Sequence, residues 1–380
     1  MQANVFEQAS IKGMQLKNRF IRSATIEGLA TFDGRPTQEL KELYCTLAEG
    51  KVGFIITGTA CIEAWKNNPG TPGWKSPLAI SPFAIFDDRY IDSWQEIIGA
   101  VHARGTKIAL QIGHMGRQDL PEMRGSTPIA PSAVSINNSQ LVPREMTVSD
   151  IEDVVEKFAQ ACRRAKEAGF DAVQIHGAHG NLINNFMSPF TNLRTDAYGD
   201  STANRARLVV DIVNRTRMLV GPDFPLMIKM NFNDFVEGGL EKDDAVEIAR
   251  IIAQAGIDCI EVSGGTLSET RNHIAVKGIQ QEHQEAYFRT YAQALKEKVS
   301  IPVMLVGGIR SPQVAAKVIE EGAADFISLC RPLIREPALI KRWENGDLEK
   351  AKCISCNQCF ENWMFRPLRC YVDEPLEKSE

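Results

Sequence analysis

Two groups of residues in the sequence have the types and the spacing that chemistry requires. His176 and His179 lie three residues apart directly after a short apolar run, so both imidazoles can face one cavity. Imidazoles can hydrogen-bond a substrate oxygen or bind a metal ion. No carboxylate stands nearby as an obvious third metal ligand, which weighs against a metal site here without excluding one.

The second group is a set of cysteines near the C-terminus. Four of the nine cysteines fall in the last thirty residues with the spacing C-x2-C-x2-C-x10-C, namely Cys353, Cys356, Cys359 and Cys370. Four thiolates so arranged can hold a [4Fe–4S] cluster or a zinc ion, and a degenerate, empty site is the third interpretation. The others are scattered singly in apolar surroundings, where we expect small core residues: Cys45, Cys61, Cys162, Cys259 and Cys330.

The elements that must position these residues alternate along the chain. Short apolar runs, typical of parallel strands buried on both faces, alternate with longer amphipathic stretches typical of helices. The predicted strands are Arg19–Thr25, Val52–Thr59, Lys107–Gly113, Asp171–Gly177, Leu226–Asn231, Cys259–Gly264, Val303–Gly307 and Phe326–Cys330. The clearest predicted helices are Ile151–Ala168 with Ser149 as its N-cap, Ala203–Leu219, Lys242–Ala255, Glu282–Lys298 and Pro312–Glu321.

This alternation predicts an α/β protein built as a closed TIM (β/α)8 barrel. A doubly wound open sheet is the alternative, but no G-x-G-x-x-G motif follows the first strand. We expect residues 1–340 to form the barrel, with a hairpin over Phe6–Lys17 at its bottom, and residues 341–380 to form a Cys-rich C-terminal extension. The long segment Gly116–Thr147 after the third strand is typical of a functional loop or a lid.

Composition and charge narrow the class of function. The 380 residues are 44% hydrophobic and carry a formal net charge of -5, with no basic stripe. These features weigh against binding to nucleic acid or to an anionic membrane surface. The N-terminus has no apolar segment of signal-peptide length, and no apolar run reaches the roughly 18 residues of a membrane span. We therefore expect a cytoplasmic protein that acts on a small molecule.

Polar and small residues cluster at the carboxyl ends of the predicted strands, where the active site of a TIM barrel lies. Gly307, Gly308 and Arg331 follow the last two strands, so backbone amides and a guanidinium can bind a phosphate there. A tight turn beside a surface arginine is the plainer alternative. Other strand ends supply hydrogen-bonding groups for a planar polar ligand: Thr25, Gln111 and Lys229.

Six motifs, in order along the chain, resemble those of the old yellow enzyme family of FMN-dependent barrel oxidoreductases. The motifs are Leu16-Lys-Asn-Arg19, Gln111-Ile-Gly-His-Met-Gly-Arg117, His176-Gly-Ala-His179-Gly180, Asn204-Arg-Ala-Arg207 after Asp196-Ala-Tyr-Gly199, Val306-Gly-Gly-Ile309 and Arg331-Pro-Leu-Ile-Arg-Glu-Pro337. The resemblance covers roughly Val5 to Leu339. It implies that the ligand is FMN rather than a generic phosphate, with NAD(P)H as a candidate electron donor.

The resemblance also implies roles for single residues. By this analogy Ala60 and Gln111 contact the isoalloxazine ring, and Thr25 hydrogen-bonds flavin O4. Lys229 stands near flavin N1 and O2, where the family usually has arginine, and its cation stabilises the anionic reduced flavin. The residues implied to hold the FMN phosphate are Gly307, Gly308, Cys330 and Arg331. Cys330 stands where glycine is common.

The histidine pair is similar to the pair that binds the carbonyl oxygen of an unsaturated substrate in this family. Two hydrogen bonds there withdraw charge as hydride passes from flavin N5 to the β-carbon. The usual proton donor is a tyrosine two residues after the second member of the pair, and here that position is Asn181. An amide has no pKa suited to this task, so another acid or water donates the proton, or the net reaction is not alkene reduction.

The cysteine segment resembles the one that carries the iron-sulfur cluster in trimethylamine dehydrogenase and bacterial 2,4-dienoyl-CoA reductase, down to the run Cys353-Ile-Ser-Cys356-Asn357. Those enzymes pass electrons one at a time between FMN and an outside partner through the cluster. The resemblance therefore implies a [4Fe–4S] cluster, and it leaves both a redox partner protein and a homo-oligomer open.

Three functions remain open on this basis. The first is the reduction of an activated C=C bond of an unsaturated carbonyl compound by hydride transfer from flavin N5. The second is a dehydrogenase or demethylase that passes electrons from a small donor through FMN and an iron-sulfur cluster, which the missing tyrosine favours slightly. The third is a flavin-loaded electron-transfer protein without catalysis of its own.

Overall fold

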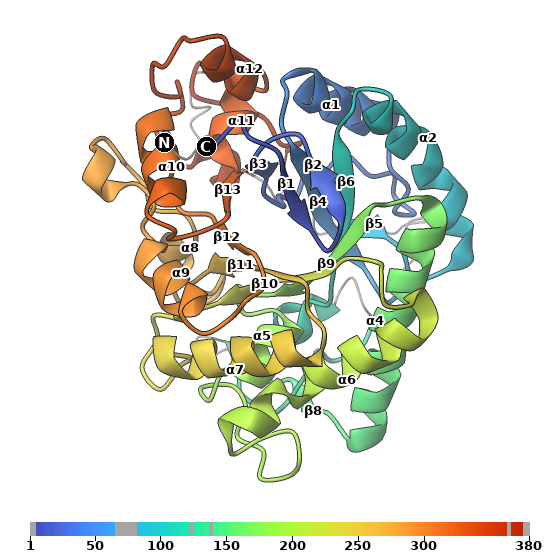
Figure 1. Cartoon of the computed structure of the whole chain (residues 1–380). Coiled ribbons are helices and arrows are strands. Elements are labelled where there is room, and N and C mark those ends of the chain that lie inside the picture. Colours follow the sequence, from blue (N-terminus) through green and yellow to red (C-terminus); the bar gives the residue numbers. More distant parts are fainter. Residues whose placement is uncertain (1–4, 65–81, 122–124, 137–139, 363–365, 375–380) are drawn as a thin grey trace.

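Eight parallel strands close into a barrel at the centre of the molecule (Figure 1). The computed structural model describes residues 5–64, 82–121, 125–136, 140–362 and 366–374. β3 pairs with both β4 and β13, which closes the ring. The barrel strands are β3 (Phe20–Arg22), β4 (Phe54–Cys61), β6 (Lys107–Gly113), β9 (Ala172–Gly177), β10 (Leu226–Asn231), β11 (Cys259–Ser263), β12 (Val303–Leu305) and β13 (Phe326–Leu329). The TIM barrel predicted from the sequence is confirmed.

Helices form the outer layer around the barrel (Figure 1). They are α1 (Gln38–Glu49), η1 (Asp88–Tyr90), α2 (Ile91–His102), η2 (Gly116–Gln118), α4 (Val148–Ala168), α5 (Leu182–Met187), α6 (Thr202–Val220), α7 (Lys242–Ala255), α8 (Arg271–Ile274), η3 (Glu282–Gln284), α9 (Arg289–Lys296), α10 (Pro312–Glu320), α11 (Arg331–Arg335), α12 (Leu339–Glu344) and α13 (Gln358–Glu361). Within the described ranges, no helix combines the length and the apolar character that crossing a bilayer requires.

The start of α4 differs from the sequence prediction. Thr147, not Ser149, is the N-cap, and its hydroxyl accepts a hydrogen bond from the backbone N–H of Asp150. The Asp150 carboxylate accepts the N–H of Thr147 in return, which completes a capping box. Ser149 was the wrong choice because an acidic residue stands three positions after Thr147, and this pairing satisfies two free amides at once.

The predicted helix Glu282–Lys298 is interrupted in the structure. It is divided into η3 and α9, because the chain between them bonds to the loop after β12 instead of to itself. The backbone N–H of Tyr287 donates to Gly307 O at 3.1 Å. The carboxylate of Glu285 accepts both the N–H and the hydroxyl of Ser311 at the start of α10. Tertiary hydrogen bonds thus override the helical periodicity at this point.

The barrel interior is built in layers, because side chains along a strand alternate between inside and outside. The lowest layer is apolar and draws on every barrel strand: Ile21, Phe54, Ile56, Ala109, Ala172, Met227, Cys259, Met304 and Phe326. The hairpin β1 (Ala9–Ile11) and β2 (Met14–Leu16) packs against it, as the sequence predicted. Two residues further along the strands, the next layer is polar and buried: Ser23, Gln111, Gln174, Lys229, Glu261 and Ser328.

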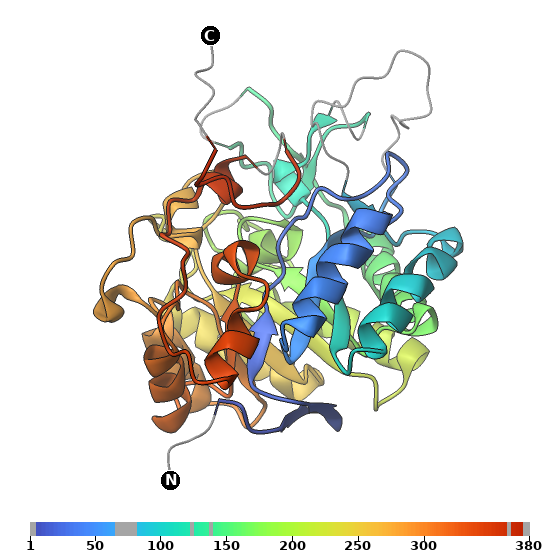
Figure 2. The same cartoon turned by 90° about the horizontal axis from the view of Figure 1, so that it is seen from above.

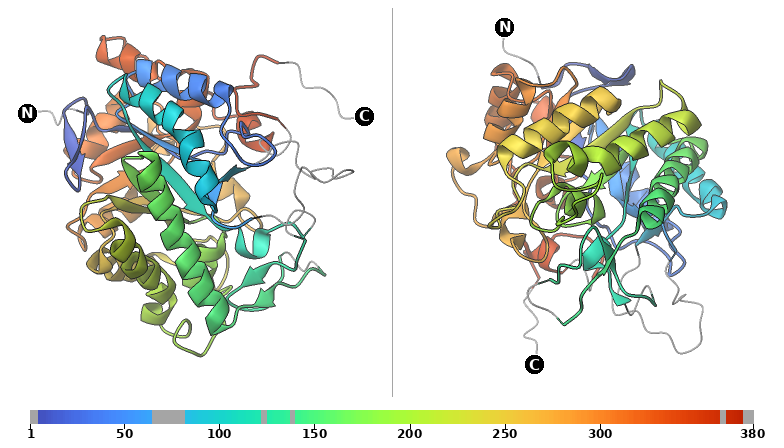
Figure 3. Two further views of the ribbon diagram at one scale, coloured as in Figure 1. Left: turned by 90° about the vertical axis from the view of Figure 1, so that its right-hand side faces the viewer. Right: turned by 90° about the horizontal axis from the view of Figure 1, so that it is seen from below.

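The two ends of the barrel are covered differently. Figure 2 shows the dark blue hairpin at one end, and the teal segment after β6 together with the dark red C-terminal segment at the other. Figure 3 shows the same separation from two further sides. The segment after β6 contains the short parallel pair β7 (Ile129–Ala130) and β8 (Arg144–Glu145), while β5 (Phe83–Ala84) pairs in parallel with the end of β4. The strands therefore end beneath the long loops, which is where a TIM barrel carries its active site.

Candidate active site

A cavity of about 410 Å³ lies at the carboxyl ends of the barrel strands. This volume falls within the range of about 300–1,000 Å³ that is usual for small-molecule and cofactor sites. Most of the site residues predicted from the sequence line it: Thr25, Gln111, His176, His179, Lys229, Gly308, Cys330 and Arg331. Ala60 and Gly307 are not among the lining residues, and the role implied for each stays a prediction.

His176 and His179 lie side by side on the cavity wall, with their ring centroids 5.3 Å apart in an edge-to-face arrangement. Burial, together with the positive charge of Lys229, lowers the pKa of His176 to about 3. Burial also holds the pKa of His179 well below its usual range, and His176 and Lys229 lower it further. Both imidazoles are therefore uncharged at neutral pH and can each donate one N–H.

The position of His179 is fixed through both its ring and its backbone. One ring nitrogen, Nε2, lies 2.7 Å from Ser263 Oγ, which leaves Nδ1 as its other polar atom. Its backbone adopts a left-handed φ of 63°, and its N–H donates to Asn231 Oδ1 at 3.2 Å. Nδ1 of His176, in contrast, is buried without a hydrogen-bond partner. An unpartnered buried nitrogen at a cavity wall is typical of a group that completes its bonding with a ligand.

Asn181, which replaces the family's tyrosine, lies on the same wall and is held by neighbouring loops. Its Oδ1 accepts a hydrogen bond from Gln118 Nε2 at 3.3 Å, and Gln118 Oε1 accepts one from the Ser268 hydroxyl at 2.9 Å. The group facing the cavity here is thus an amide backed by an amide and a hydroxyl. None of these three side chains is an acid that can donate a proton at neutral pH.

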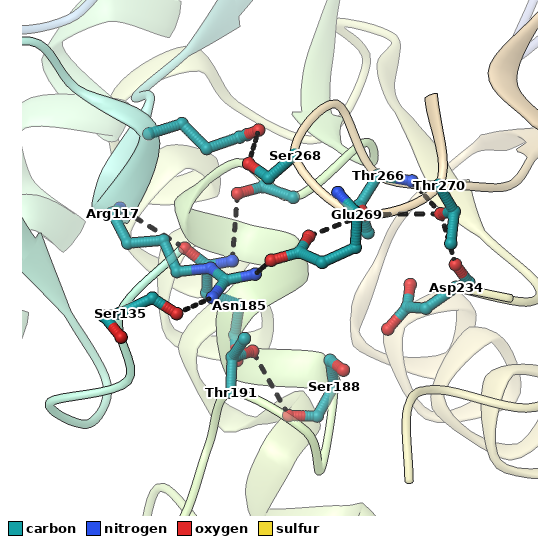
Figure 4. A network of polar contacts seen from close by, with 12 residues as sticks. Arg117, Ser135, Asn185, Ser188, Thr191, Asp234, Thr266, Ser268, Glu269 and Thr270 are labelled. Atoms are coloured by element: carbon teal, nitrogen blue, oxygen red, sulfur yellow. Dashed lines mark hydrogen bonds and ion pairs between the residues drawn. The ribbon is translucent and has the colours of Figure 1, made fainter. Parts of the chain in front are cut away.

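A buried ion pair ties together the loops that surround this wall (Figure 4). Arg117 in η2 pairs with Glu269 after β11 at 2.5 Å, with only 1% and 10% of the two side chains exposed. The guanidinium also donates to the carbonyl of Ser135 at 3.2 Å, and Glu269 accepts from the Thr266 hydroxyl at 2.8 Å. Loops from three parts of the chain are therefore fixed to one another beside Gln118 and the histidine pair.

The residues predicted to bind an anion follow β12 and β13, and this role stays a prediction. Gly307 and Gly308 have φ values of 143° and 72°, which residues with a Cβ rarely adopt. A Cβ on Gly308 would also lie 2.2 Å from Ile279 Cδ1, so only glycine fits. Cys330 Sγ lies 3.0 Å from Thr25 Oγ1, and any contact of Cys330 with a phosphate therefore falls to its backbone.

The four C-terminal cysteines surround a second, much smaller cavity of about 20 Å³. Burial raises the pKa of Cys359 to about 12, with smaller contributions from nearby thiols that include Cys353. Within the part of the chain that the structure describes, no group of three or more His, Cys, Asp or Glu side chains is arranged to hold a metal ion. The [4Fe–4S] cluster and the zinc ion that the cysteine spacing allows both stay predictions.

The two cavities share a wall. Arg331, Ile334 and Cys359 line both of them. Arg331 donates to Oδ1 of Asn357 in the cysteine segment and, at 2.8 Å, to the carbonyl of Val276. Asn357 in turn donates to the carbonyl of Ala275. The guanidinium predicted to bind the FMN phosphate is therefore held in place by the segment that carries the cysteines.

Comparison with known sequences assigns the chain to a family. Residues 4–349 match the NADH:flavin oxidoreductase / NADH oxidase family. The chain belongs to this family. This result confirms the family that the six motifs predicted. A relative called NADH oxidase, from Thermoanaerobacter brockii, is 36% identical over 370 residues, which make up 96% of this chain and 55% of that protein.

Solved structures agree with this assignment. A 2-naphthoyl-CoA reductase in complex with 2-naphthoyl-CoA superimposes with a TM-score of 0.87 at 25% identity, covering 98% of this chain and 57% of that one. Histamine dehydrogenase from Rhizobium sp. 4-9 gives a TM-score of 0.85 at 26% identity, covering 97% and 52%. The present chain spans about half the length of the first curated relatives that it matches, 55% and 53%.

The structure also brings to the site two residues that the sequence analysis did not select. Glu261 and Gln174 are fully buried in the polar layer directly beneath the cavity. Each is a polar residue in the middle of an otherwise apolar strand, two positions before Ser263 and His176 respectively. Because side chains alternate along a strand, that spacing places each on the inner face, and this signal was available in the sequence.

Proposed function

We propose that the chain is an FMN-dependent oxidoreductase that takes electrons from NAD(P)H and reduces an activated C=C bond of an unsaturated carbonyl compound. The observation that carries this proposal is the pair of uncharged histidines on the wall of a cavity that Lys229 also lines. Membership of the NADH:flavin oxidoreductase family supports the flavin and the nicotinamide donor.

The residues of the cavity fit FMN. Lys229 offers a cation above the barrel centre, and Gln111 uses one N–H toward Gln174 at 2.7 Å, which leaves its second N–H for a ligand. Arg331 and Gly308 offer a guanidinium and an open backbone at the predicted phosphate end. When bound there, FMN supplies a carrier that accepts and returns a hydride.

In this proposal His176 and His179 bind the carbonyl oxygen of the substrate. Two neutral N–H donors stabilise the charge that develops on that oxygen, and each such donor is worth about 10²–10³ in rate at a buried site. Neutral donors suit this site because Lys229 already supplies a positive charge to the same cavity. A second cation there would have to be desolvated without a counter-charge.

The proton for the α-carbon must come from a group other than Asn181. Among the described residues that line the cavity, Asp119 is the one carboxyl group, and it directly follows Gln118, the partner of Asn181. We therefore propose that a water molecule oriented by the Asp119 carboxylate delivers this proton.

A second candidate function runs in the opposite direction: a dehydrogenase that oxidises a small donor and passes electrons out through an iron-sulfur cluster. Two observations favour it, namely the amide at position 181 and the wall shared between the two cavities. Four cysteines of this segment line the smaller cavity, and four thiolates can hold a [4Fe–4S] cluster.

An anaerobic titration separates the two candidates. The purified protein is mixed with NADH, with NADPH, or with an amine alone, and the flavin spectrum is followed before cyclohexenone or an enoyl thioester is added. The reductase is expected to lose its flavin absorbance with a nicotinamide donor and to regain it with an unsaturated carbonyl compound. Loss of absorbance with the amine alone, or no recovery with any acceptor, would refute the first proposal.

Two measurements complete this experiment. The His176→Leu and His179→Leu variants are expected to slow reoxidation by the acceptor about 10²-fold or more, because each removes a donor to the developing charge. The His283→Leu variant, which changes an exposed histidine away from the cavity, is the matched control and keeps the wild-type rate. Iron and acid-labile sulfide analysis tests the cluster, with four of each per chain expected for [4Fe–4S].

A further inference from the structure

A chain of buried hydrogen bonds crosses the barrel directly beneath the cavity. Thr59 on β4 donates to Gln111 Oε1, Gln111 Nε2 donates to Gln174 Oε1 at 2.7 Å, and Gln174 Nε2 donates to Glu261 Oε2 at 2.8 Å. From the opposite side, Ser23 donates its hydroxyl proton to Glu261 Oε1 at 2.7 Å. The strand register brings these side chains together, since Gln111 is paired with Gln174 across β6 and β9.

Lys229 completes this chain. Its Nζ donates to Ser23 Oγ at 2.8 Å and lies 3.4 Å from Glu261 Oε2, and the two residues are partners in the β10–β11 register. Only 5% of the Lys229 side chain and none of the Glu261 side chain are exposed. Both series of hydrogen bonds, from Gln111 through Gln174 and from Lys229 through Ser23, end at one acceptor, the carboxylate of Glu261.

We propose that Glu261 is a positioning residue that sets the redox potential of the bound flavin through Lys229 and Gln111. Glu261 does not line the cavity itself, but it contacts Ser23 and Lys229, which do, and the hydrogen bonds that start at Gln111 lead through Gln174 to its carboxylate. The inference rests on the proposed binding of FMN, and it concerns this chain's own charges: a cation that faces the ring and a buried anion directly behind it.

The physical basis is the partial cancellation of two opposite charges in a poorly screened interior. Lys229 by itself stabilises the anionic reduced flavin and raises its potential. Glu261 beneath it opposes this effect, because the interaction of two buried charges is far stronger than in water. The carboxylate also fixes which way the amides of Gln174 and Gln111 point, since a carboxylate accepts and never donates.

The test is the midpoint potential of the flavin in the purified holoenzyme. Glu261→Gln removes the negative charge at nearly constant volume, and we expect the ratio of reduced to oxidised flavin at a fixed potential to rise tenfold or more, which is about 30 mV for a two-electron couple. Lys229→Met is expected to shift the potential in the opposite direction. The Lys229→Met/Glu261→Gln double variant, which loses both charges, is expected to return close to the wild-type value.

Two variants act as controls. Glu261→Asp retains the charge and is expected to keep the potential near that of the wild type. Asp258→Asn removes a carboxylate from the other end of the same strand, where only 8% of the Asp258 side chain is exposed and it pairs with Arg217 at 2.5 Å. Because Asp258 lies about 10 Å further from the cavity along β11, the potential is expected to stay unchanged.

The outcomes are distinguishable. A wild-type protein without flavin would overturn both the proposed function and this inference. A wild type that binds flavin, combined with an unchanged potential in Glu261→Gln, would overturn the inference alone. If Glu261→Gln does not fold, the potential of the double variant is compared with that of Lys229→Met instead. The double variant removes both charges of the Lys229–Glu261 pair together and leaves neither charge buried without a partner. A double variant with the same shift as Lys229→Met would then refute it.

Discussion

Both histidines of the pair are expected to stay uncharged from pH 8 down to at least pH 5. The pKa of His176 is lowered to about 3 by burial and by Lys229, whereas an unperturbed histidine has a pKa of about 6.5. At pH 6 an unperturbed imidazole is about three-quarters protonated, but one with a pKa near 3 is protonated in about one molecule in a thousand. Substrate binding should therefore show no break near pH 6.5 that arises from this pair.

The lowered pKa of His176 also affects the stability of the folded protein. The unfolded chain binds a proton at the His176 imidazole below about pH 6.5, but the native state excludes it until about pH 3. The stability present at neutral pH is consequently lost as the pH falls through this window. Three and a half pKa units correspond to about 5 kcal/mol from His176 alone over the whole window, so the free energy of unfolding is expected to decrease steadily as the pH falls below about 6.5.

The assay is a pH titration of the holoenzyme labelled with ¹⁵N-histidine and followed by NMR. The protein has six histidines, and the His176→Asn and His179→Asn variants assign the two signals that matter. Each is expected to keep the nitrogen shifts of a neutral imidazole down to pH 5. A midpoint near pH 6.5 for either residue would refute the charge state on which the proposed mechanism rests.

The Lys229→Met variant separates the two causes of the low pKa of His176, which are burial and the positive charge of Lys229. It removes the cation but leaves the burial, which is the larger cause. The pKa of His176 is therefore expected to rise in this variant and yet to remain well below 6.5. A full return to 6.5 would show that charge, not burial, keeps the imidazole neutral.

Three further predictions concern single side chains. Asn181→Tyr places a phenol at the family's usual proton-donor position, and reoxidation of the reduced flavin by cyclohexenone is expected to accelerate about tenfold to a hundredfold; an unchanged rate would mean that proton delivery is not limiting. Asn357→Ala removes a hydrogen-bond partner of Arg331, so FMN is expected to bind about tenfold more weakly, as measured by equilibrium dialysis, whereas unaltered affinity would show that Arg331 needs no such support. Glu269→Ala leaves Arg117 buried without its counter-charge and is expected to lower the free energy of unfolding, measured in urea, by about 3–5 kcal/mol. The control, Glu247→Ala at the exposed Glu247–Arg250 pair, is expected to lower it by less than about 1 kcal/mol. Equal losses in the two variants would contradict this reasoning.

The barrel itself was predictable because its signal is local. Lys107–Gly113 and Leu226–Asn231 are strands in the structure with the bounds read from the sequence, since continuous apolar runs require burial on both faces. The break between η3 and α9 was not predictable, because it depends on hydrogen bonds of Glu285 and Tyr287 to a loop about twenty residues away in the sequence.

The residues of the candidate site likewise fall into those that the sequence predicted and those that it did not. The strand-end rule found the histidine pair, Lys229 and Arg331, all of which line the cavity. It did not find Glu261, because a carboxylate beneath the cavity acts through other side chains and not at the strand end. The sequence also did not predict the hydrogen bond between Arg331 and Asn357. These two residues meet only because the C-terminal extension folds back onto the barrel, and no periodicity in the sequence encodes the course of that extension.

The most direct test of the central claim is a single-turnover experiment under anaerobic conditions. The flavin of the holoenzyme is reduced with one equivalent of NADH and then mixed rapidly with an unsaturated carbonyl compound in the wild type and in the His176→Leu/His179→Leu double variant. The account predicts that the wild type is reoxidised with formation of the saturated product, and that the double variant is slower by at least about 10²-fold. Equal rates in the two proteins, or no saturated product from the wild type, would contradict it.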